Sequence, residues 1–292
     1  MAINYRILSP DRFTDYEILD CGSGKKLERF GKVKLIRPEP AANWKPQLSF
    51  DEWKSVANAQ FISQDGQKGK WEMLKDTDTT WRLGYKSPDV NLTFMLKLTS
   101  FKHVGLFPEQ CVHWDYIFRA SKALHKPKVL NLFAYTGAAS LAAKAAGADV
   151  IHLEGLKQLV AWARQNMELN KLDNIRWLIE DALKFVKREV KRGNKYNGII
   201  MDPPSFGIGP AGERFVLEDQ LAELIGHVGK LLDDKSFIVC NSYSYKFSAL
   251  TLSNMFNRHL AKKHFDELGE LATPFGQNKL LSHGVYFRSK NY

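Results

Sequence analysis

The residues with the clearest chemical potential are Asp202, Pro203, Pro204 and Phe206, which follow directly on the apolar segment 198–201. Two prolines fix φ and remove N–H donors from the turn, so its carbonyl groups can face a ligand. The Asp202 carboxylate and the Pro203 carbonyl can accept hydrogen bonds from an amino group, and Phe206 can stack on a flat ring. An ordinary Asp-Pro-Pro turn is the alternative, but its place after a buried strand favours a catalytic group for a planar, nitrogen-bearing acceptor.

A second candidate group surrounds the turn 133–137, between a predicted strand and a predicted helix. A single glycine there lets the backbone approach a ligand closely, and the helix start presents unpaired N–H groups. Because the three glycines of a dinucleotide-binding turn are absent, the sequence favours a cofactor without a pyrophosphate. The candidate ligand-binding residues of this group are Asn131, Phe133, Ala134, Tyr135, Thr136 and Gly137.

Carboxylates follow the next two predicted strands, at Glu154 and Asp181, each with a small neighbour, Gly155 and Ala182. Glu154 lies 17 positions after the glycine of the turn, near the spacing at which a carboxylate accepts ribose hydroxyls. An exposed Glu at a strand end is the alternative. Asp181 can accept the exocyclic amine of adenine, cap the following helix, or do both.

These residues need a parallel sheet that brings strand ends together. From about residue 105, short apolar segments alternate with amphipathic ones, which predicts a doubly wound α/β sheet. The predicted strands are 129–133, 150–153, 175–179, 198–201 and 237–240, and the predicted helices are 111–124, 138–146, 156–170, 182–192 and 218–232. Two further strands, 265–271 and 284–288, predict an antiparallel hairpin at the sheet edge. Ligands of such sheets bind beyond the carboxyl ends of the strands, where the candidate residues lie.

The first hundred residues follow another pattern. Short alternating segments at 32–37, 81–85 and 92–98 are separated by prolines and polar breaks, which predicts a small β-rich domain. The sequence therefore predicts two domains, 1–104 and 105–292.

The composition is that of a globular protein, with 44% hydrophobic and 25% charged residues in 292. The longest apolar runs have the length of strands, so we expect no membrane span. The N-terminus lacks the apolar core of a signal peptide. Three cysteines, Cys21, Cys111 and Cys240, are few and far apart, and we expect a reducing cytoplasm rather than a disulfide framework. His103, Cys111 and His113 lack a second ligand pair at useful spacing, so we expect no metal site.

The net charge of +10 and the pI near 9.3 favour a polyanionic partner, although many proteins are basic for no specific reason. Two clusters could follow phosphates, and the second also fits an ordinary solvated helix face. They comprise Lys25, Lys26, Arg29, Lys32, Lys34 and Arg37 in the first domain, and Lys184, Lys187, Arg188, Lys191, Arg192 and Lys195 in the second.

The lines NLFAYTGAAS, HLEGLKQLVAWARQN, EDALKFV and IIMDPPSFG resemble class I S-adenosylmethionine-dependent methyltransferases, and among them the group that modifies large-subunit ribosomal RNA. The resemblance covers 105–288. It implies a Rossmann-like seven-stranded methyltransferase sheet with a C-terminal antiparallel hairpin, alongside the smaller N-terminal β-rich domain. The segment 105–110 is similar to the family segment that closes the cofactor pocket, here through Phe107 and Gln110.

The resemblance also implies roles for the candidate residues toward S-adenosylmethionine. The turn 133–137 would hold its methionine part, Glu154 the ribose and Asp181 the adenine amine. Asp202 and Pro203 would line the junction of cofactor and acceptor. The usual Asp at the end of the second strand is replaced here by Glu154.

One departure from the family changes the expected chemistry. Members that methylate carbon 5 of cytosine carry Ser-Cys-Ser after the fifth strand, whereas this chain has Tyr243 at the position of that cysteine. Carbon 5 requires a thiolate that adds to the ring, and we expect Cys240, the last residue of an apolar strand, to be buried and inert. A nitrogen needs only orientation and a proton acceptor. We therefore expect N-methylation of a base in ribosomal RNA.

Three alternatives stay open: a methyltransferase for a protein or small molecule, because the same turn can hold an amide; a 5-methylcytosine RNA methyltransferase; and a non-catalytic RNA-binding protein with a vestigial cofactor fold. The nucleotide, the methylated atom and the oligomeric state are not determined by the sequence.

Overall fold

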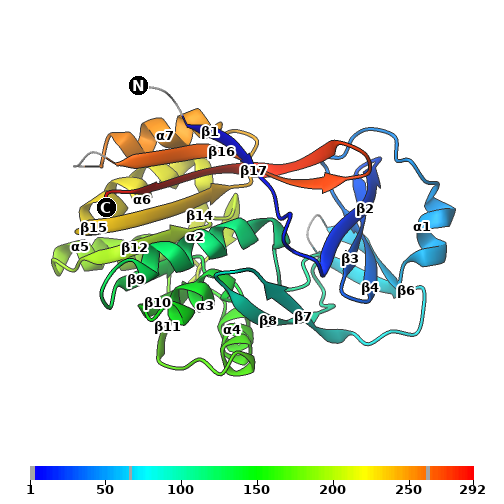
Figure 1. The fold of residues 1–292 in the computed structure, drawn as a ribbon, viewed down its shortest axis with the longest axis horizontal. Helices are drawn as coiled ribbons and strands as arrows, with labels where there is room; N and C mark the ends of the chain where they lie inside the picture. Colours follow the sequence, from blue (N-terminus) through cyan, green and yellow to red (C-terminus); the bar gives the residue numbers. More distant parts are fainter. Residues whose placement is uncertain (1–3, 66–67, 261–263) are drawn as a thin grey trace. The chain divides into compact units, whose positions relative to one another are not determined.

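The computed structural model describes residues 4–65, 68–260 and 264–292. The chain forms two compact units: unit 1 comprises Met1–Leu8, Val112–Leu271 and Gly284–Tyr292, and unit 2 comprises Ser9–Cys111 and Ala272–His283. Each unit therefore contains segments from distant parts of the sequence, which Figure 1 shows by colour. The division into domains 1–104 and 105–292 stays a prediction.

Unit 1 contains a mixed sheet with the strand order β11-β10-β9-β12-β15-β17-β16, and β1 pairs with β16. Neighbours from β11 to β15 are parallel, and β17 is antiparallel to β15. The strands are β1 Tyr5–Leu8, β9 Lys128–Leu132, β10 Asp149–Glu154, β11 Ile175–Ile179, β12 Tyr196–Met201, β15 Leu232–Ser242, β16 Phe265–Phe275 and β17 Lys279–Lys290. The helices are α2 Cys111–Lys122, α3 Ala138–Ala145, α4 Lys157–Leu169, α5 Ala182–Lys191, α6 Leu217–Leu231 and α7 Ala249–Asn257.

Helices cover both faces of this sheet, which explains why its strands are continuous apolar runs. Successive side chains of a strand point to opposite faces. On β15, Ile238 and Cys240 belong to the core that contains residues of α5, α6 and α7. Phe237, one residue before Ile238, points to the opposite face and contacts Tyr116 of α2, with ring centroids 6.4 Å apart.

The strand order reverses between β9 and β12 (Figure 1). From β9, the chain builds outward through β10 and β11, and it then returns to add β12 and β15 on the other side. Leu132, the last residue of β9, pairs with Leu153 on one side and with Met201 on the other. The residues that follow β9, β10 and β12 therefore lie side by side, at the place where sheets of this kind bind ligands.

Unit 2 contains the strand order β2-β3-β4-β5-β6, antiparallel except for the parallel pair β4–β5. Helix α1 makes the crossover that a parallel pair requires, and its Trp53 is buried with Leu27 and Ile36. Strands β7 and β8 form a separate antiparallel sheet. The bounds are β2 Tyr16–Gly22, β3 Lys25–Phe30, β4 Val33–Pro38, α1 Phe50–Val56, β5 Ala59–Asp65, β6 Lys68–Met73, β7 Thr80–Lys86, β8 Asn91–Lys97 and the 3-10 helix η1 Pro108–Gln110.

Within residues 4–65, 68–260 and 264–292, no helix has the length and apolar character needed to span a membrane. The same part of the chain contains no cluster of three or more His, Cys, Asp or Glu side chains arranged to hold a metal ion.

Candidate functional site

The turn 133–137 follows β9 with an unusual backbone. Phe133 and Tyr135 both have a positive φ, 55° and 50°, which is uncommon for residues with a side chain and persists where the surroundings fix it. Two bonds to the neighbouring strand fix it here. The Ala134 N–H donates to the Leu153 carbonyl at 3.0 Å, and the Tyr135 N–H donates to Glu154 Oε2 at 3.0 Å. The end of β10 therefore holds the turn in shape.

Gly137 is required for two reasons. Its φ of 92° favours glycine, and a Cβ at this position would lie 3.1 Å from the Cβ of Ala163 on α4. The neighbouring residue, Thr136, is buried, and its carbonyl accepts a hydrogen bond from Asn166 Nδ2 at 2.9 Å. The close approach of α4 thus fixes the end of the turn at the start of α3.

Asn131 lies in the sheet below the turn and is 2% exposed. Its Nδ2 donates to Ser140 Oγ at 2.9 Å, and Ser140 Oγ lies 3.1 Å from His152 Nδ1. Burial lowers the pKa of His152 to about 3, so this buried chain is uncharged near neutral pH. These hydrogen bonds connect β9, α3 and β10 beneath the turn. A direct contact of Asn131 with a cofactor stays a prediction.

Glu154 is the carboxylate at the end of β10. Its Oε2 accepts the Tyr135 N–H and its Oε1 accepts the Leu156 N–H at 3.1 Å. Burial raises the pKa of Glu154, and hydrogen bonds from the backbone of Tyr135, Leu156 and Gly155 oppose part of that rise. Each carboxylate oxygen has a second acceptor site. Glu154 can therefore hold the turn and accept hydroxyl donors at once, with Gly155 beside it.

Asp181 begins α5. Its Oδ1 accepts the Lys184 N–H at 2.8 Å, which confirms the predicted helix cap. Ala182, the first residue of the helix, is buried. The cap uses one oxygen of the carboxylate, so the predicted contact with an adenine amine is compatible with it and stays a prediction.

The candidate catalytic residues follow β12. Asp202 is part-buried, Pro203 is buried, and Pro204 is exposed. Phe206 exposes 54% of its surface, so its ring is available to a partner. The turn thus combines a part-buried carboxylate with an accessible aromatic ring, and the catalytic roles of these residues stay a prediction.

The structure confirms that Cys240 is buried, with no exposed surface. Burial, with the charge of Asp202 as a second cause, raises the pKa of the Cys240 thiol well above its usual range. A thiol in this environment stays protonated and is a poor nucleophile.

Phe107 and Gln110 lie in unit 2, at the helix η1. The Gln110 N–H donates to the Phe107 carbonyl at 3.1 Å, and the Phe107 ring lies 5.0 Å from the ring of His103. Gln110 is 9% exposed. Their role in closing a cofactor pocket stays a prediction.

The phosphate-tracking role is wrong for two members of the first basic cluster. Lys26 and Arg37 are buried in unit 2 and surround Glu28, whose Oε1 lies 2.5 Å from Arg37 Nε. Because they neutralise a buried carboxylate, they face the protein interior rather than a nucleic acid.

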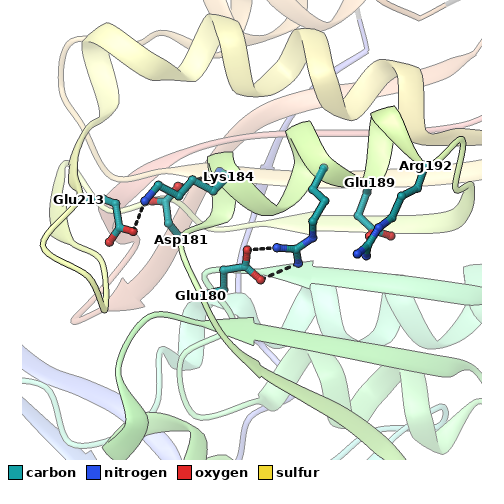
Figure 2. A network of polar contacts seen from close by, with 7 residues as sticks. Glu180, Asp181, Lys184, Glu189, Arg192 and Glu213 are labelled. Atoms are coloured by element: carbon teal, nitrogen blue, oxygen red, sulfur yellow. Dashed lines mark hydrogen bonds and ion pairs between the residues drawn. The ribbon is translucent and has the colours of Figure 1, made fainter.

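In the second basic cluster, most side chains already have partners, and Figure 2 shows Lys184 with Glu213 and Arg192 beside Glu189. This agrees with the alternative of a solvated helix face. The ion pairs are Lys184–Glu213, Lys187–Glu223, Arg188–Glu180 and Arg192–Glu189, and Lys195 donates to two backbone carbonyls.

The element that follows the Asp202 turn is not among those predicted from the sequence. Strands β13 Phe206–Ile208 and β14 Arg214–Val216 form an antiparallel hairpin. Its Phe215 is buried, with its ring 5.0 Å from that of Phe133. The sequence does contain a turn signal, Gly-Pro-Ala-Gly, but the flanking strands of three residues are too short to show a periodic pattern.

The chemistry of this edge fits an adenosine cofactor that bears a sulfonium. Ribose hydroxyls and an adenine amine are donors, and the edge offers carboxylates at Glu154 and Asp181. The turn 133–137 offers backbone groups held in a fixed, unusual conformation.

Comparisons with known proteins agree with this geometry. Residues 72–267, more than half of the chain, match the family of S-adenosylmethionine-dependent methyltransferases. The chain is similar to the SAM-dependent methyltransferase from Agrobacterium tumefaciens, with 34% identity, 98% of this chain and 93% of that chain covered, and a TM-score of 0.89. It shares its fold with SMU.776, solved in complex with SAH, at 18% identity, with 96% of this chain and 76% of that chain covered and a TM-score of 0.74.

A curated relative, the ribosomal RNA large subunit methyltransferase K/L of Shewanella frigidimarina, is 31% identical over 158 residues. The match covers 53% of this chain and 22% of that relative, so the chain spans about a fifth of its length. The family match and the A. tumefaciens structure extend over far more of the chain. The chain therefore belongs to the S-adenosylmethionine-dependent methyltransferase family.

Proposed function

We propose that unit 1 binds S-adenosylmethionine at the carboxyl edge of β9, β10 and β12 and directs its methyl group to a nitrogen of a base in ribosomal RNA. The observation that carries this proposal is the register at the strand reversal. Leu132 pairs with both Leu153 and Met201, which sets Phe133, Glu154 and Asp202 side by side. We also propose the seven-stranded form of the family sheet, β11 through β16, with its antiparallel hairpin and a β-rich accessory domain.

Each proposed cofactor contact follows from a described local geometry. The turn 133–137 would contact the methionine part, with Asn131 supporting it from below. Glu154 and Gly155 would hold the ribose, and Asp181 with Ala182 the adenine. The family resemblance also assigns Phe107 and Gln110 to closing a cofactor pocket, and this role stays a prediction.

The acceptor would be held by the turn that follows β12. S-adenosylmethionine supplies an electrophilic methyl group. Asp202 would accept a hydrogen bond from the acceptor N–H and direct the nitrogen lone pair toward the cofactor side, and the Pro203 carbonyl would accept a second one. Pro204 stiffens the turn, and the exposed ring of Phe206 would stack on the base.

Nitrogen rather than carbon 5 is the acceptor atom that this site supports. Cys240 is wholly buried and its thiol pKa is raised, so the thiolate needed to activate carbon 5 is not provided. If Cys240→Ala nevertheless abolished transfer while the protein stayed folded, the 5-methylcytosine alternative would be favoured.

RNA is the acceptor class that the relatives and the charge favour. The matched K/L enzyme is a ribosomal RNA methyltransferase by name, and the chain has a net charge of +10, which attracts polyanions. We accordingly propose a cytoplasmic location, where ribosomal RNA is processed.

The Asp202 assignment is tested by methyl transfer from labelled S-adenosylmethionine to unmodified ribosomal RNA. We expect Asp202→Ala to reduce the rate by about a hundredfold or more, because orientation and proton transfer are both lost. Asp173→Ala, at an exposed carboxylate of the same unit, is the matched control. Unchanged transfer by Asp202→Ala would show that another group orients the acceptor.

Calorimetry with S-adenosylmethionine tests the cofactor half separately. We expect binding by the wild type and weaker binding by Glu154→Gln, while a wild type that binds no cofactor would indicate a non-catalytic RNA-binding protein. Mass mapping of ribosomal RNA from a strain that lacks the protein would identify the nucleotide. A complete set of modifications in that strain would favour a protein or small-molecule acceptor instead.

A further inference from the structure

The hairpin of residues 205–217 is a built element rather than a loose loop. Its strands β13 and β14 pair in register, with Gly207 opposite Phe215. The Leu217 N–H donates to the Ser205 carbonyl at 3.1 Å at the base, and the Gly209 N–H donates to the Glu213 carbonyl at 2.7 Å near the tip. Bonds at both ends keep the hairpin in one shape.

One face of the 205–217 hairpin contacts residues beside each predicted part of the cofactor site. Phe215 packs on Phe133 of the methionine turn, with ring centroids 5.0 Å apart. The tip lies over the ribose position, because a Cβ built on Gly155 would have Pro210 Cδ as its nearest atom, at 3.7 Å. Glu213 pairs with Lys184, three residues beyond Asp181. The hairpin thus runs across the ends of β9, β10 and β11.

Glu213 connects the tip of the hairpin to the start of α5. Its Oε2 accepts the Ala211 N–H at 2.9 Å, and its Oε1 accepts from Lys184 Nζ at 2.5 Å. The Lys184 backbone N–H is the one that Asp181 caps. Figure 2 shows Glu213, Lys184 and Asp181 together at this end of the helix. A single residue of α5 therefore holds both the hairpin and the carboxylate proposed for the adenine.

The other face of the hairpin is open. Phe206 and Ile208 alternate with Gly207 on β13, so they share a face, and they expose 54% and 59% of their surfaces. The buried face, with Phe215 at 3%, is the one turned to the strand ends. The two faces therefore have different roles, the inner one toward the cofactor edge and the outer one toward the acceptor.

We propose that the 205–217 hairpin is the outer wall of the adenosine half of the cofactor site, and that the Lys184–Glu213 ion pair holds this wall against Gly155 and slows the release of the cofactor. Glu213 and Lys184 are positioning residues in this scheme, since they act through the hairpin rather than on the reacting atoms. The inference rests on the proposed cofactor site.

The experiment measures the dissociation rate of labelled S-adenosylmethionine from the full chain after dilution into excess unlabelled cofactor. An exposed ion pair contributes only weakly, because water screens both charges. We therefore expect Lys184→Met and Glu213→Gln each to accelerate release by about two- to fivefold, with little change in the association rate. Lys184→Arg keeps the charge and should keep the wild-type rate.

Two controls distinguish an effect through the 205–217 hairpin from a general loss of protein stability. Lys187→Met removes the Lys187–Glu223 pair on the same helix, at 2.6 Å but directed to α6 instead of the hairpin, and should leave release unchanged. High salt screens an exposed ion pair, so it should accelerate release from the wild type but not from Lys184→Met. Melting temperatures verify folding, and if Glu213→Gln does not fold, the more exposed Lys184 variant supplies the result.

Wild-type release rates in folded Lys184→Met and Glu213→Gln would overturn the inference while leaving the cofactor site intact, and so would equal acceleration by Lys187→Met. A wild type that binds neither S-adenosylmethionine nor its demethylated product would overturn the proposed function, and the hairpin's role with it.

Discussion

Lys26 of β3 and Arg37 of β4 in unit 2 surround a buried carboxylate, whereas the basic residues of α5 in unit 1 lie on a solvent-exposed helix face. In unit 2, Glu28 has no exposed surface and accepts hydrogen bonds from Arg37 Nε at 2.5 Å and from the Tyr16 hydroxyl at 3.0 Å. Lys26 Nζ lies 3.7 Å away. Arg37 also donates to the Lys102 carbonyl at 3.0 Å, so this network connects strands to a distant loop of the same unit.

The pairs of α5 have similar distances but different surroundings. Arg188 makes two bonds to Glu180, at 2.5 and 2.7 Å, with 41% and 25% of the side chains exposed. Lys187 and Glu223 are 42% and 47% exposed. Water solvates such charges whether or not they are paired, so the pairs add little free energy.

The difference shows that burial, rather than distance or charge pattern, decides the energetic weight of an ion pair. Removing one partner from a buried network leaves an uncompensated charge in a medium of low polarity. Removing one partner at the surface returns the other to water. Three substitutions and one pH series test this comparison, and they follow in order of decreasing expected effect.

The largest effect is expected for Glu28→Gln. It leaves Arg37 buried without its carboxylate, whereas Lys26 keeps Glu39 at 3.2 Å, and we expect the free energy of unfolding to fall by about 3–5 kcal/mol. Urea unfolding of the full chain measures it. Glu17→Gln, whose pair with Arg29 is 50% and 25% exposed, is the control and should lower it by less than about 1 kcal/mol. Equal losses in the two variants would refute the distinction.

The pH dependence gives the next effect. Burial by itself raises the pKa of Glu28, but Arg37 and Lys26 outweigh it, so the pKa lies below the ordinary value of 4.5. A group with a lowered folded pKa stabilises the protein above its unfolded pKa, and this stabilisation is lost as the pH falls below about 4.5 toward the folded value. As the pH is lowered through this range, the urea concentration at the unfolding midpoint should fall less steeply for Glu28→Gln than for the wild type. Parallel curves would contradict the assigned shift.

A smaller effect is expected for Arg188→Gln. The bidentate geometry is the best among the α5 pairs described here, and charge-assisted paired bonds of this kind are stronger than single ones. Partial exposure limits the gain, so we expect a loss of about 0.5–1 kcal/mol in the free energy of unfolding. A loss near that of Glu28→Gln would show that geometry outweighs burial.

The smallest effect is expected for Lys187→Met. Both members of its pair are more than 40% exposed, and we expect a change of less than about 0.5 kcal/mol. Because its charge is already balanced by Glu223, the salt dependence of RNA binding should also stay unchanged within error. If Lys187→Met clearly decreased the slope of the logarithm of the RNA-binding constant against the logarithm of the salt concentration, Lys187 would be assigned a phosphate contact.

Much of the methyltransferase core could be predicted because its signals are local. The predicted strand 175–179 coincides with β11, and the predicted helix 182–192 with α5, Ala182–Lys191. Buried parallel strands read as apolar runs, and Asp181 signals a helix start by capping it. The core prediction is confirmed by the fold and by the family match.

Other elements gave weaker signals. The strand predicted at 237–240 is the centre of β15, Leu232–Ser242, whose first residues are polar and hide its length. Helix α7 begins after a capping Ser248 and places Leu252 and Phe256 at helical spacing. The sequence contains this pattern, but α7 is not among the predicted helices. The 205–217 hairpin depends on contacts with Phe133 and Lys184, which are distant in sequence.

The sequence by itself determined the alternation of strands and helices, the turn with its single glycine, and the carboxylates at the strand ends, since each depends on neighbours within a few residues. Only the tertiary structure decided which charges are buried. Arg37 and Arg188 are the same residue type in equally basic segments, yet one is 5% exposed and the other has a side chain 41% exposed. Burial is a property of the packed fold, because it depends on which distant segments exclude water from a side chain.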